Sequence, residues 1–180
     1  MSEKILLLRS LRSEDEMDRR WAEDYQDEYD RPRLFISDGI ELSDEYPAGL
    51  RALYRLSDSP AFGDVYFNPQ HLFKRQPPID DQGNCVRDGN LIQIGSVDEQ
   101  SLLLDLDTGA ALIFDFLYFR HGLADGFVLE CPDVAELVNT VALGPRYSAI
   151  HGPHGLWAEP WWTDDPWYNY LVEIGMIVGS

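Results

Sequence analysis

Two histidines that lie three positions apart, His151 and His154, are the part of this sequence closest to a metal site. Such a pair can share a zinc ion, but a complete site needs three or four protein ligands. Gly152 and Pro153 separate the two histidines and rule out a regular helix. No cysteine or carboxylate lies close by before Glu159. We therefore expect a polar surface loop with no metal and no cofactor, and a hydrolase that uses His151 and His154 is the less favoured alternative.

Carboxylates that could act as a general acid and base are numerous, but the sequence does not identify which two would form such a pair. A working pair needs environments that separate the two pKa values. The acids of residues 98–115 lie in or near predicted turns, so we interpret them as solvated. Cys131 lies at the start of a predicted helix, whose dipole could lower the thiol pKa; partial burial is the simpler interpretation. The motifs GxGxxG, GxxxxGK[ST] and GxSxG do not occur. We predict that the chain is not an enzyme.

The charge of the chain is strongly unbalanced, with 32 acidic residues against 14 basic ones and a net charge of −18. Nucleic-acid binding is driven by Lys and Arg side chains that release counterions. We therefore predict no direct contact with nucleic acid and none with an anionic membrane surface. A basic protein partner would be attracted over a distance. The alternative is that the acidity only keeps the protein soluble.

Length and hydropathy favour one folded domain of a cytoplasmic protein. A chain of 180 residues with 44% hydrophobic residues is typical of a globular domain. Its N-terminal apolar run, residues 5–8, is too short for a signal-peptide core or a membrane span. Cys85 and Cys131 are isolated, so we expect no disulfide framework.

Residues 12–30 combine regularly spaced large apolar side chains with many acids. Every fourth residue is large and apolar, which predicts a helix with one apolar face: Met17, Trp21, Tyr25 and Tyr29. We expect this face to pack on the core and the acidic face to be solvated. If the acidic face instead takes part in binding, its candidate contact residues are Glu23, Asp24, Asp27 and Glu28.

The clearest predicted element is a meander of three strands, at residues 91–95, 101–106 and 110–116. Its second break is Asp107-Thr108-Gly109, and aspartate and glycine beside a short break are typical of a hairpin. Leu102 to Leu104 place apolar side chains on both faces of the sheet. We therefore expect helices to cover it.

Helices and short strands are predicted on either side of the meander, which gives an α+β fold. Proline or glycine marks the helix ends, and we predict helices from 43–47 to 57, from 130–133 to 143, and from 164–166 to 174. Short strands are predicted at 33–37 and 64–68. The stretch 75–90 is rich in Pro, Gly, Asn and Asp, which indicates a loop.

Tryptophan is concentrated near the C-terminus, with four tryptophans in residues 157–167. Trp161 and Trp162 could be exposed anchors of the kind that dominate interface energies, or they could pack over one end of the sheet. We divide the chain into an α+β domain, residues 1–143, and a Trp-rich C-terminal extension, residues 144–180, that packs on the same domain.

The central part of the chain resembles the SUKH superfamily. The similarity rests on the strand Leu91–Gly95, the acidic turn after it, the Asp-Leu-Asp-Thr-Gly ending at Gly109, and the third strand, 110–115. Upstream, Tyr46-Pro47 with Leu50, and the strand 62–67, are similar to the family's helix entry and the strand after it. The helix at 133–143 lies where the family places its closing helix, so the similarity covers residues 43–143.

The resemblance implies an α+β fold with a twisted, mostly antiparallel sheet flanked by helices, and a role without catalysis. Most bacterial members look like immunity proteins that bind and neutralise a cognate toxin, often a nuclease. Others are general interaction modules, as in fungal cell-wall regulators. A basic toxin domain is therefore the implied partner, and the acidity fits it because opposite charges speed association. Candidate contacts beyond residues 12–30 are Asp98, Glu99, Trp161 and Trp162.

Overall fold

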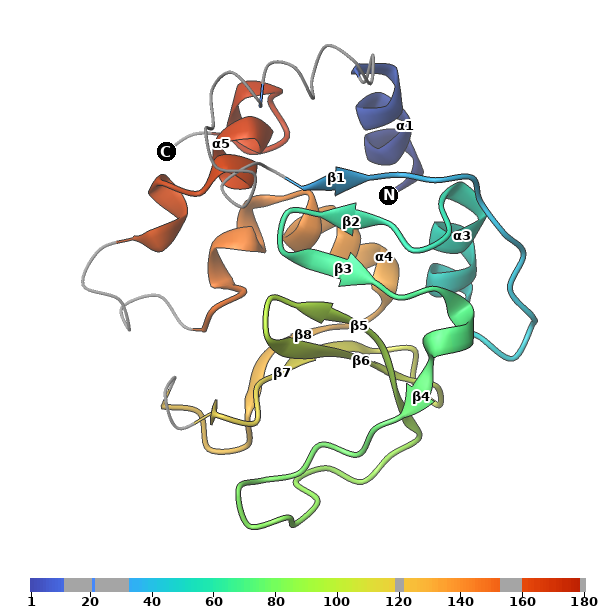
Figure 1. The fold of residues 1–180 in the computed structure, drawn as a ribbon, viewed down its shortest axis with the longest axis vertical. Coiled ribbons are helices and arrows are strands. Elements are labelled where there is room, and N and C mark those ends of the chain that lie inside the picture. The colour runs from blue at the N-terminus through green and yellow to red at the C-terminus, as the bar shows by residue number, and fades with distance from the viewer. Residues whose placement is uncertain (12–20, 22–32, 119–121, 153–159, 179–180) are drawn as a thin grey trace.

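The computed structural model describes residues 1–11, 21, 33–118, 122–152 and 160–178 (Figure 1). Over these residues eight strands form one sheet, and every pair of neighbours is antiparallel. The predicted α+β fold, with a mostly antiparallel sheet and flanking helices, is confirmed. The strands lie in the order β1 (Leu34–Phe35), β2 (Ala61–Phe62), β3 (Val65–Phe67), β5 (Leu91–Val97), β6 (Gln100–Asp105), β7 (Ala111–Phe114) and β8 (Phe127–Cys131). The short strand β4 (Lys74–Arg75) pairs with the first half of β5, and β3 pairs with the second half.

The predicted meander is the centre of this sheet, formed by β5, β6 and β7. The first turn is shorter than predicted, because β5 runs past Gly95 to Val97 and leaves only Asp98–Glu99 between the strands. Gly95 does not end the strand. It allows a close approach to β3, since a Cβ there would lie 1.9 Å from the Tyr66 carbonyl oxygen. The second predicted turn is present, with Gly109 at a φ of +83°.

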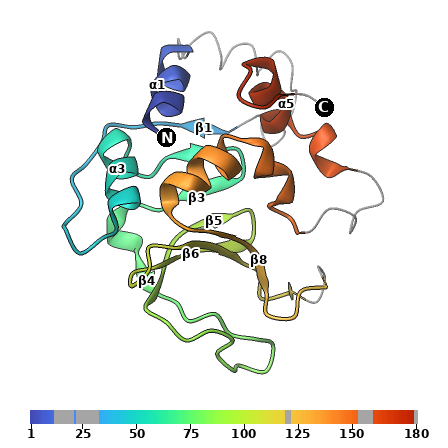
Figure 2. The ribbon, with the colours of Figure 1, turned by 180° about the vertical axis from the view of Figure 1, so that it is seen from behind.

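Helices α3 (Ala48–Leu56) and α4 (Val134–Glu136) lie on one side of the sheet, and η4 (Leu137–Ala142) continues α4 as a π-helix (Figure 2). Both begin later than predicted. Residues 44–46 form a turn, and Pro47 is the N-cap of α3. Cys131 ends strand β8, which the sequence did not predict, and Asp133 caps α4 by accepting a hydrogen bond from the Glu136 N–H (2.7 Å).

The remaining helical elements are α1 (Ser2–Leu11), η2 (Gln70–Leu72), η5 (Pro145–Ala149), η6 (Trp161–Thr163) and α5 (Pro166–Glu173). The last of these follows the prediction closely. Asp165 is its N-cap and accepts a hydrogen bond from the Tyr168 N–H (2.6 Å), and Pro166 occupies the first turn, where no N–H is needed. Gly175, at a φ of +75°, comes just after its end.

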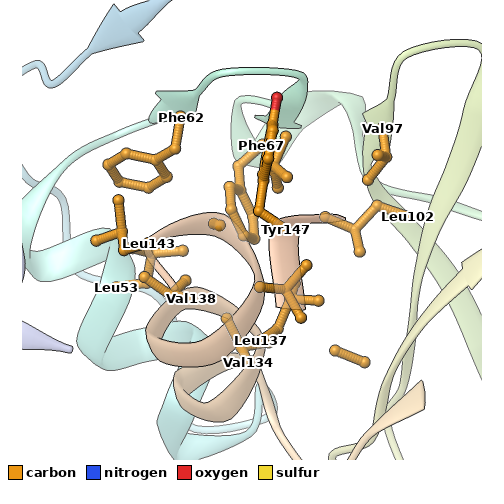
Figure 3. Close-up of a cluster of buried hydrophobic side chains, with 14 of the residues drawn as sticks. Leu53, Phe62, Phe67, Val97, Leu102, Val134, Leu137, Val138, Leu143 and Tyr147 are labelled. Carbon is orange, nitrogen blue, oxygen red and sulfur yellow. The ribbon is translucent and has the colours of Figure 1, made fainter. Parts of the chain in front are cut away.

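The main core lies between the sheet and the helices. Figure 3 shows part of it, with side chains of α4 and η4 packed among side chains of the strands, of α3 and of η5. Val134, Leu137, Val138 and Val141 form the apolar side that the sequence predicted for this helix, and each is at most 1% exposed.

The opposite face of the sheet carries a smaller cluster, formed by Leu91, Leu103, Leu112 and Phe114. In the described part of the chain no helix contributes to this cluster; the loop between β4 and β5 does, through Val86. Arg87 holds the loop in place, because its guanidinium carbon lies 4.0 Å from the centroid of the Phe127 ring and its Nη2 lies 3.2 Å from Glu130 Oε2. Among the described residues, helices thus cover one face as predicted, whereas a loop, and not a predicted helix, covers part of the other.

The segment after Gly144 shares the main core. Trp167 is 1% exposed, and its Nε1 donates a hydrogen bond to the Ala142 carbonyl (3.0 Å). Trp21 is helical and packs edge-on against Tyr170, with 5.5 Å between the ring centroids. The other residues of the helix predicted at 12–30, Met17, Tyr25 and Tyr29 among them, lie outside the described residues.

Candidate functional site

Two turns of the sheet and the C-terminal segment meet at one end of the sheet, on the left in Figure 1. The β2–β3 turn contains Gly63 and Asp64, and the β5–β6 turn is Asp98–Glu99. The two turns are joined directly, because the Asp98 N–H donates a hydrogen bond to the Asp64 carbonyl (3.0 Å). The backbones of the two acidic turns therefore lie side by side, although the turns are far apart in the sequence.

A glycine lets the β2–β3 turn lie against the C-terminal segment. Gly63 has a φ of +59°, and a Cβ there would lie 2.4 Å from the Trp167 ring and 2.6 Å from the Tyr147 hydroxyl. The next residue adds a hydrogen bond, since the Asp64 N–H donates to that same hydroxyl (3.1 Å). Any larger residue at position 63 would push the acidic turn away from the aromatic side chains.

A chain of ring contacts continues from Asp64 along the C-terminal segment. Nε2 of His151 lies 3.7 Å from Asp64 Oδ2. The imidazole packs edge-on against Trp161, with 4.4 Å between the ring centroids, and Trp161 in turn packs edge-on against Trp162 at 6.2 Å. The Trp161 indole N–H is buried and has no hydrogen-bond partner among the residues that the structure describes. Asp64 thus connects the two tryptophans, through His151, with the Asp98–Glu99 turn.

We call this region the turn surface and define it as Asp64, Asp98, Glu99, Trp161 and Trp162. The structure links the four predicted contact residues that it describes only indirectly: the Asp98–Glu99 turn through the backbone of Asp64, and the two tryptophans through His151. Asp98 and Glu99 form no ion pair with any other described residue. The other four predicted contact residues, Glu23, Asp24, Asp27 and Glu28, lie outside the described residues.

Charges around the turn surface interact with one another. Arg33 donates a hydrogen bond to the Tyr66 hydroxyl, and this bond together with the nearby carboxylates of Asp64 and Asp98 raises the pKa of Arg33. Asp165, at the start of α5, is half-buried, and burial raises the pKa of its carboxyl to about 6. The charge of Asp64 adds to this rise, and His151 opposes it. The carboxyl group of Asp165 is therefore poorly solvated behind the surface.

His151 is not part of an exposed polar loop, contrary to the prediction. Its side chain is only 19% exposed, because it packs between Asp64 and Trp161. His154 lies outside the described residues. Among the residues that the structure does describe, no three His, Cys, Asp or Glu side chains are placed to hold a metal ion together.

Cys131 is buried at the end of β8, so the idea of a helix dipole that activates its thiol is wrong. Burial raises the thiol pKa, against the opposing effect of Arg146, whose Nη1 lies 3.5 Å from Sγ. A buried thiol with a raised pKa is a poor nucleophile at neutral pH.

A groove of about 380 Å³ lies beside the turn surface, on the sheet face opposite the helices. It is lined by Arg75, Gln76, Pro77, Ile79, Glu99, Ser101, Phe114 and Phe116. Gln76 closes part of its floor by donating a hydrogen bond from Nε2 to Ser101 Oγ (3.0 Å). No pattern in the sequence predicted this groove. Its only signal was the presence of apolar residues, such as Ile79 and Phe116, in or beside loops.

Within the described residues no helix is long and apolar enough to cross a membrane. Comparisons with protein-family models, with curated proteins and with solved structures found no match to this chain.

Proposed function

We propose that this chain is an immunity-type protein of the cytoplasm that binds and neutralises a cognate toxin, a basic nuclease domain, through the turn surface. The observation that carries the proposal is that Asp64 connects the acidic Asp98–Glu99 turn with Trp161 and Trp162, through His151, at one end of the sheet. The resemblance of residues 43–143 to the SUKH superfamily and the net charge of −18 support it.

The chemistry of the turn surface fits a nuclease as the partner. A nuclease holds phosphates with Lys and Arg, and carboxylates can occupy the same side chains. Asp98 and Glu99 are available for this because neither is in an ion pair with another described residue. Tryptophans beside such charges supply apolar area that keeps water out of the contact, as interface anchors do. Inhibition then follows because the bound chain covers the surface that would hold the nucleic acid.

The proposal is tested with the toxin domain encoded beside the gene for this chain. We expect the two purified proteins to form a complex and the toxin's nuclease activity to be lost at equimolar ratio. If the toxin domain neither binds nor loses activity, the immunity proposal is wrong, and a general interaction module of the same family remains as the alternative.

The double variant Asp98→Asn/Glu99→Gln tests the location of the contact. Removing two unpaired carboxylates from the interface should slow association with the toxin about tenfold at low salt and flatten its salt dependence. The measurement is stopped-flow association at several salt concentrations. The matched control is Glu45→Gln/Asp107→Asn, which removes the same charge from exposed positions away from the turn surface. Equal slowing by both pairs would mean that total charge matters and the turn surface does not.

A further inference from the structure

We propose that the groove between residues 75–79 and the end of β7 receives one large apolar side chain of the partner, with a Lys or Arg next to it in the partner chain pairing with Glu99. This inference rests on the proposed function and extends it, because it states which chemical pattern on the partner is recognised. The pattern is an apolar residue flanked by a basic one in an accessible segment.

The walls of the groove are apolar and open to solvent. Ile79 is 46% exposed and Phe116 is 55% exposed, which is unusual for two large apolar side chains that line one depression. Between them the floor is formed by Phe114, which is 5% exposed, and by Ser101. A volume of about 380 Å³ is at the lower end of ligand sites and has room for one aromatic or large aliphatic side chain. Such an insertion would cover Ile79 and Phe116 together.

Charge decides which residue should accompany the apolar side chain. Glu99 lines the groove, and Asp98 precedes it in the same turn. Arg75 also lines the groove and keeps its positive charge, because its hydrogen bond from Nη2 goes to the neutral Asn90 Oδ1 (3.0 Å); the preference for a basic residue therefore rests on the two acids of the turn and on the net charge. The net charge of −18 adds a long-range field of the same sign as Glu99. A basic neighbour is therefore favoured over an acidic one.

The groove is continuous with the turn surface through one residue. Glu99 belongs to both, since its side chain lines the groove and its backbone forms the β5–β6 turn. A single folded domain can therefore contact the carboxylates and tryptophans of the turn surface while one of its apolar side chains occupies the groove. The acidic surface supplies rapid association and the groove supplies the apolar anchor that slows dissociation.

Short peptides test the groove without the toxin. The ¹⁵N-labelled chain is titrated with acetyl-Gly-Lys-Phe-Lys-Gly-amide, and amide shifts are followed by NMR. We expect shifts concentrated at residues 76, 79, 99–101 and 114–116, since Pro77 and Pro78 have no amide N–H. The peptide with Ser in place of Phe should give none, and the peptide with Glu in place of both Lys residues should bind at least about threefold more weakly. Equal shifts with the Ser peptide, or stronger binding of the Glu peptide, would overturn the proposal.

A variant pair links the groove to the toxin. Phe116→Ser removes one exposed wall, and Leu72→Ser is the control because Leu72 is 52% exposed on η2 and does not line the groove. We expect Phe116→Ser to abolish the peptide shifts and to raise the dissociation constant for the toxin about tenfold, with Leu72→Ser unchanged. If the toxin binds normally to Phe116→Ser and the peptide gives no shifts with the wild-type chain, the groove proposal is wrong while the proposed function stands. Peptide binding without toxin binding would support the groove and overturn the proposed function.

Discussion

Replacing Trp167 with alanine should lower the free energy of unfolding by about 3–5 kcal/mol, as expected for removal of a buried aromatic side chain. Trp167 is 1% exposed, and its ring lies against Gly63 in the β2–β3 turn and against Tyr170, with 5.6 Å between the ring centroids. The substitution would also remove the hydrogen bond from Nε1 to the Ala142 carbonyl, at the end of η4. One side chain thus joins α5, the π-helix and the turn that carries Asp64.

Urea unfolding of the full chain measures this effect, and two further variants separate its causes. Trp167→Phe keeps most of the ring but leaves the Ala142 carbonyl without its donor, so we expect a loss of about 1–3 kcal/mol. Trp162→Ala removes a tryptophan that is only half-buried, and its loss should be clearly smaller than that of Trp167→Ala. If Trp167→Ala lowers the free energy of unfolding no more than Trp162→Ala does, Trp167 does not hold the C-terminal segment to the core.

The sequence predicted well those elements that local residues determine. The meander followed from apolar runs separated by Asp and Gly, and α5 followed from Asp165, Pro166 and Gly175. The predictions of strand and helix ends were wrong where one residue type is compatible with two local structures. Gly95 was interpreted as the end of a strand. It lies inside β5, and glycine is needed there because the backbone of Tyr66 on the neighbouring strand leaves no room for a Cβ. Pro132 looked like part of a helix start, which hid strand β8, because that strand forms only by pairing with β7.

The candidate site was predictable only in part, for the same reason. Asp98 and Glu99 could be placed in a turn from the sequence, and Trp161 and Trp162 could be identified as possible anchors. Their common surface could not be predicted, because it depends on the contact between Asp64 and His151, which are distant in the sequence. The groove depends on where the loop after β4 crosses the second face of the sheet. That path is held by Arg87 against Phe127 and Glu130, and no local pattern indicates it.

Asp165 makes the stability of the protein depend on pH in an unusual direction. The described ionisable groups that interact with its carboxyl group are Asp64 of the β2–β3 turn, His151 after η5, and Tyr147 of η5. Burial and Asp64 raise its pKa from 3.8 to about 6, so the folded chain holds this proton more tightly than the unfolded chain does. Between about pH 4 and pH 6 the folded state therefore binds more protons, and the contribution of Asp165 to stability falls as pH rises. Above about pH 6 the full cost of the ionised group is present.

The variant Asp165→Asn should therefore be more stable than the wild type at pH 7.5, by about 1–2 kcal/mol, and nearly equal to it at pH 4. A rise in pKa from 3.8 to about 6 corresponds to roughly 3 kcal/mol, and partial solvation of the carboxyl group reduces this. Asparagine keeps the helix cap, because its side-chain oxygen can still accept the hydrogen bond from the Tyr168 N–H. Urea unfolding at pH 4, 5, 6 and 7.5 measures the difference, with Asp164→Asn as the control because Asp164 is the exposed neighbouring acid. A gain that is the same at every pH, or one that Asp164→Asn reproduces, would show that the buried charge of Asp165 is not its cause.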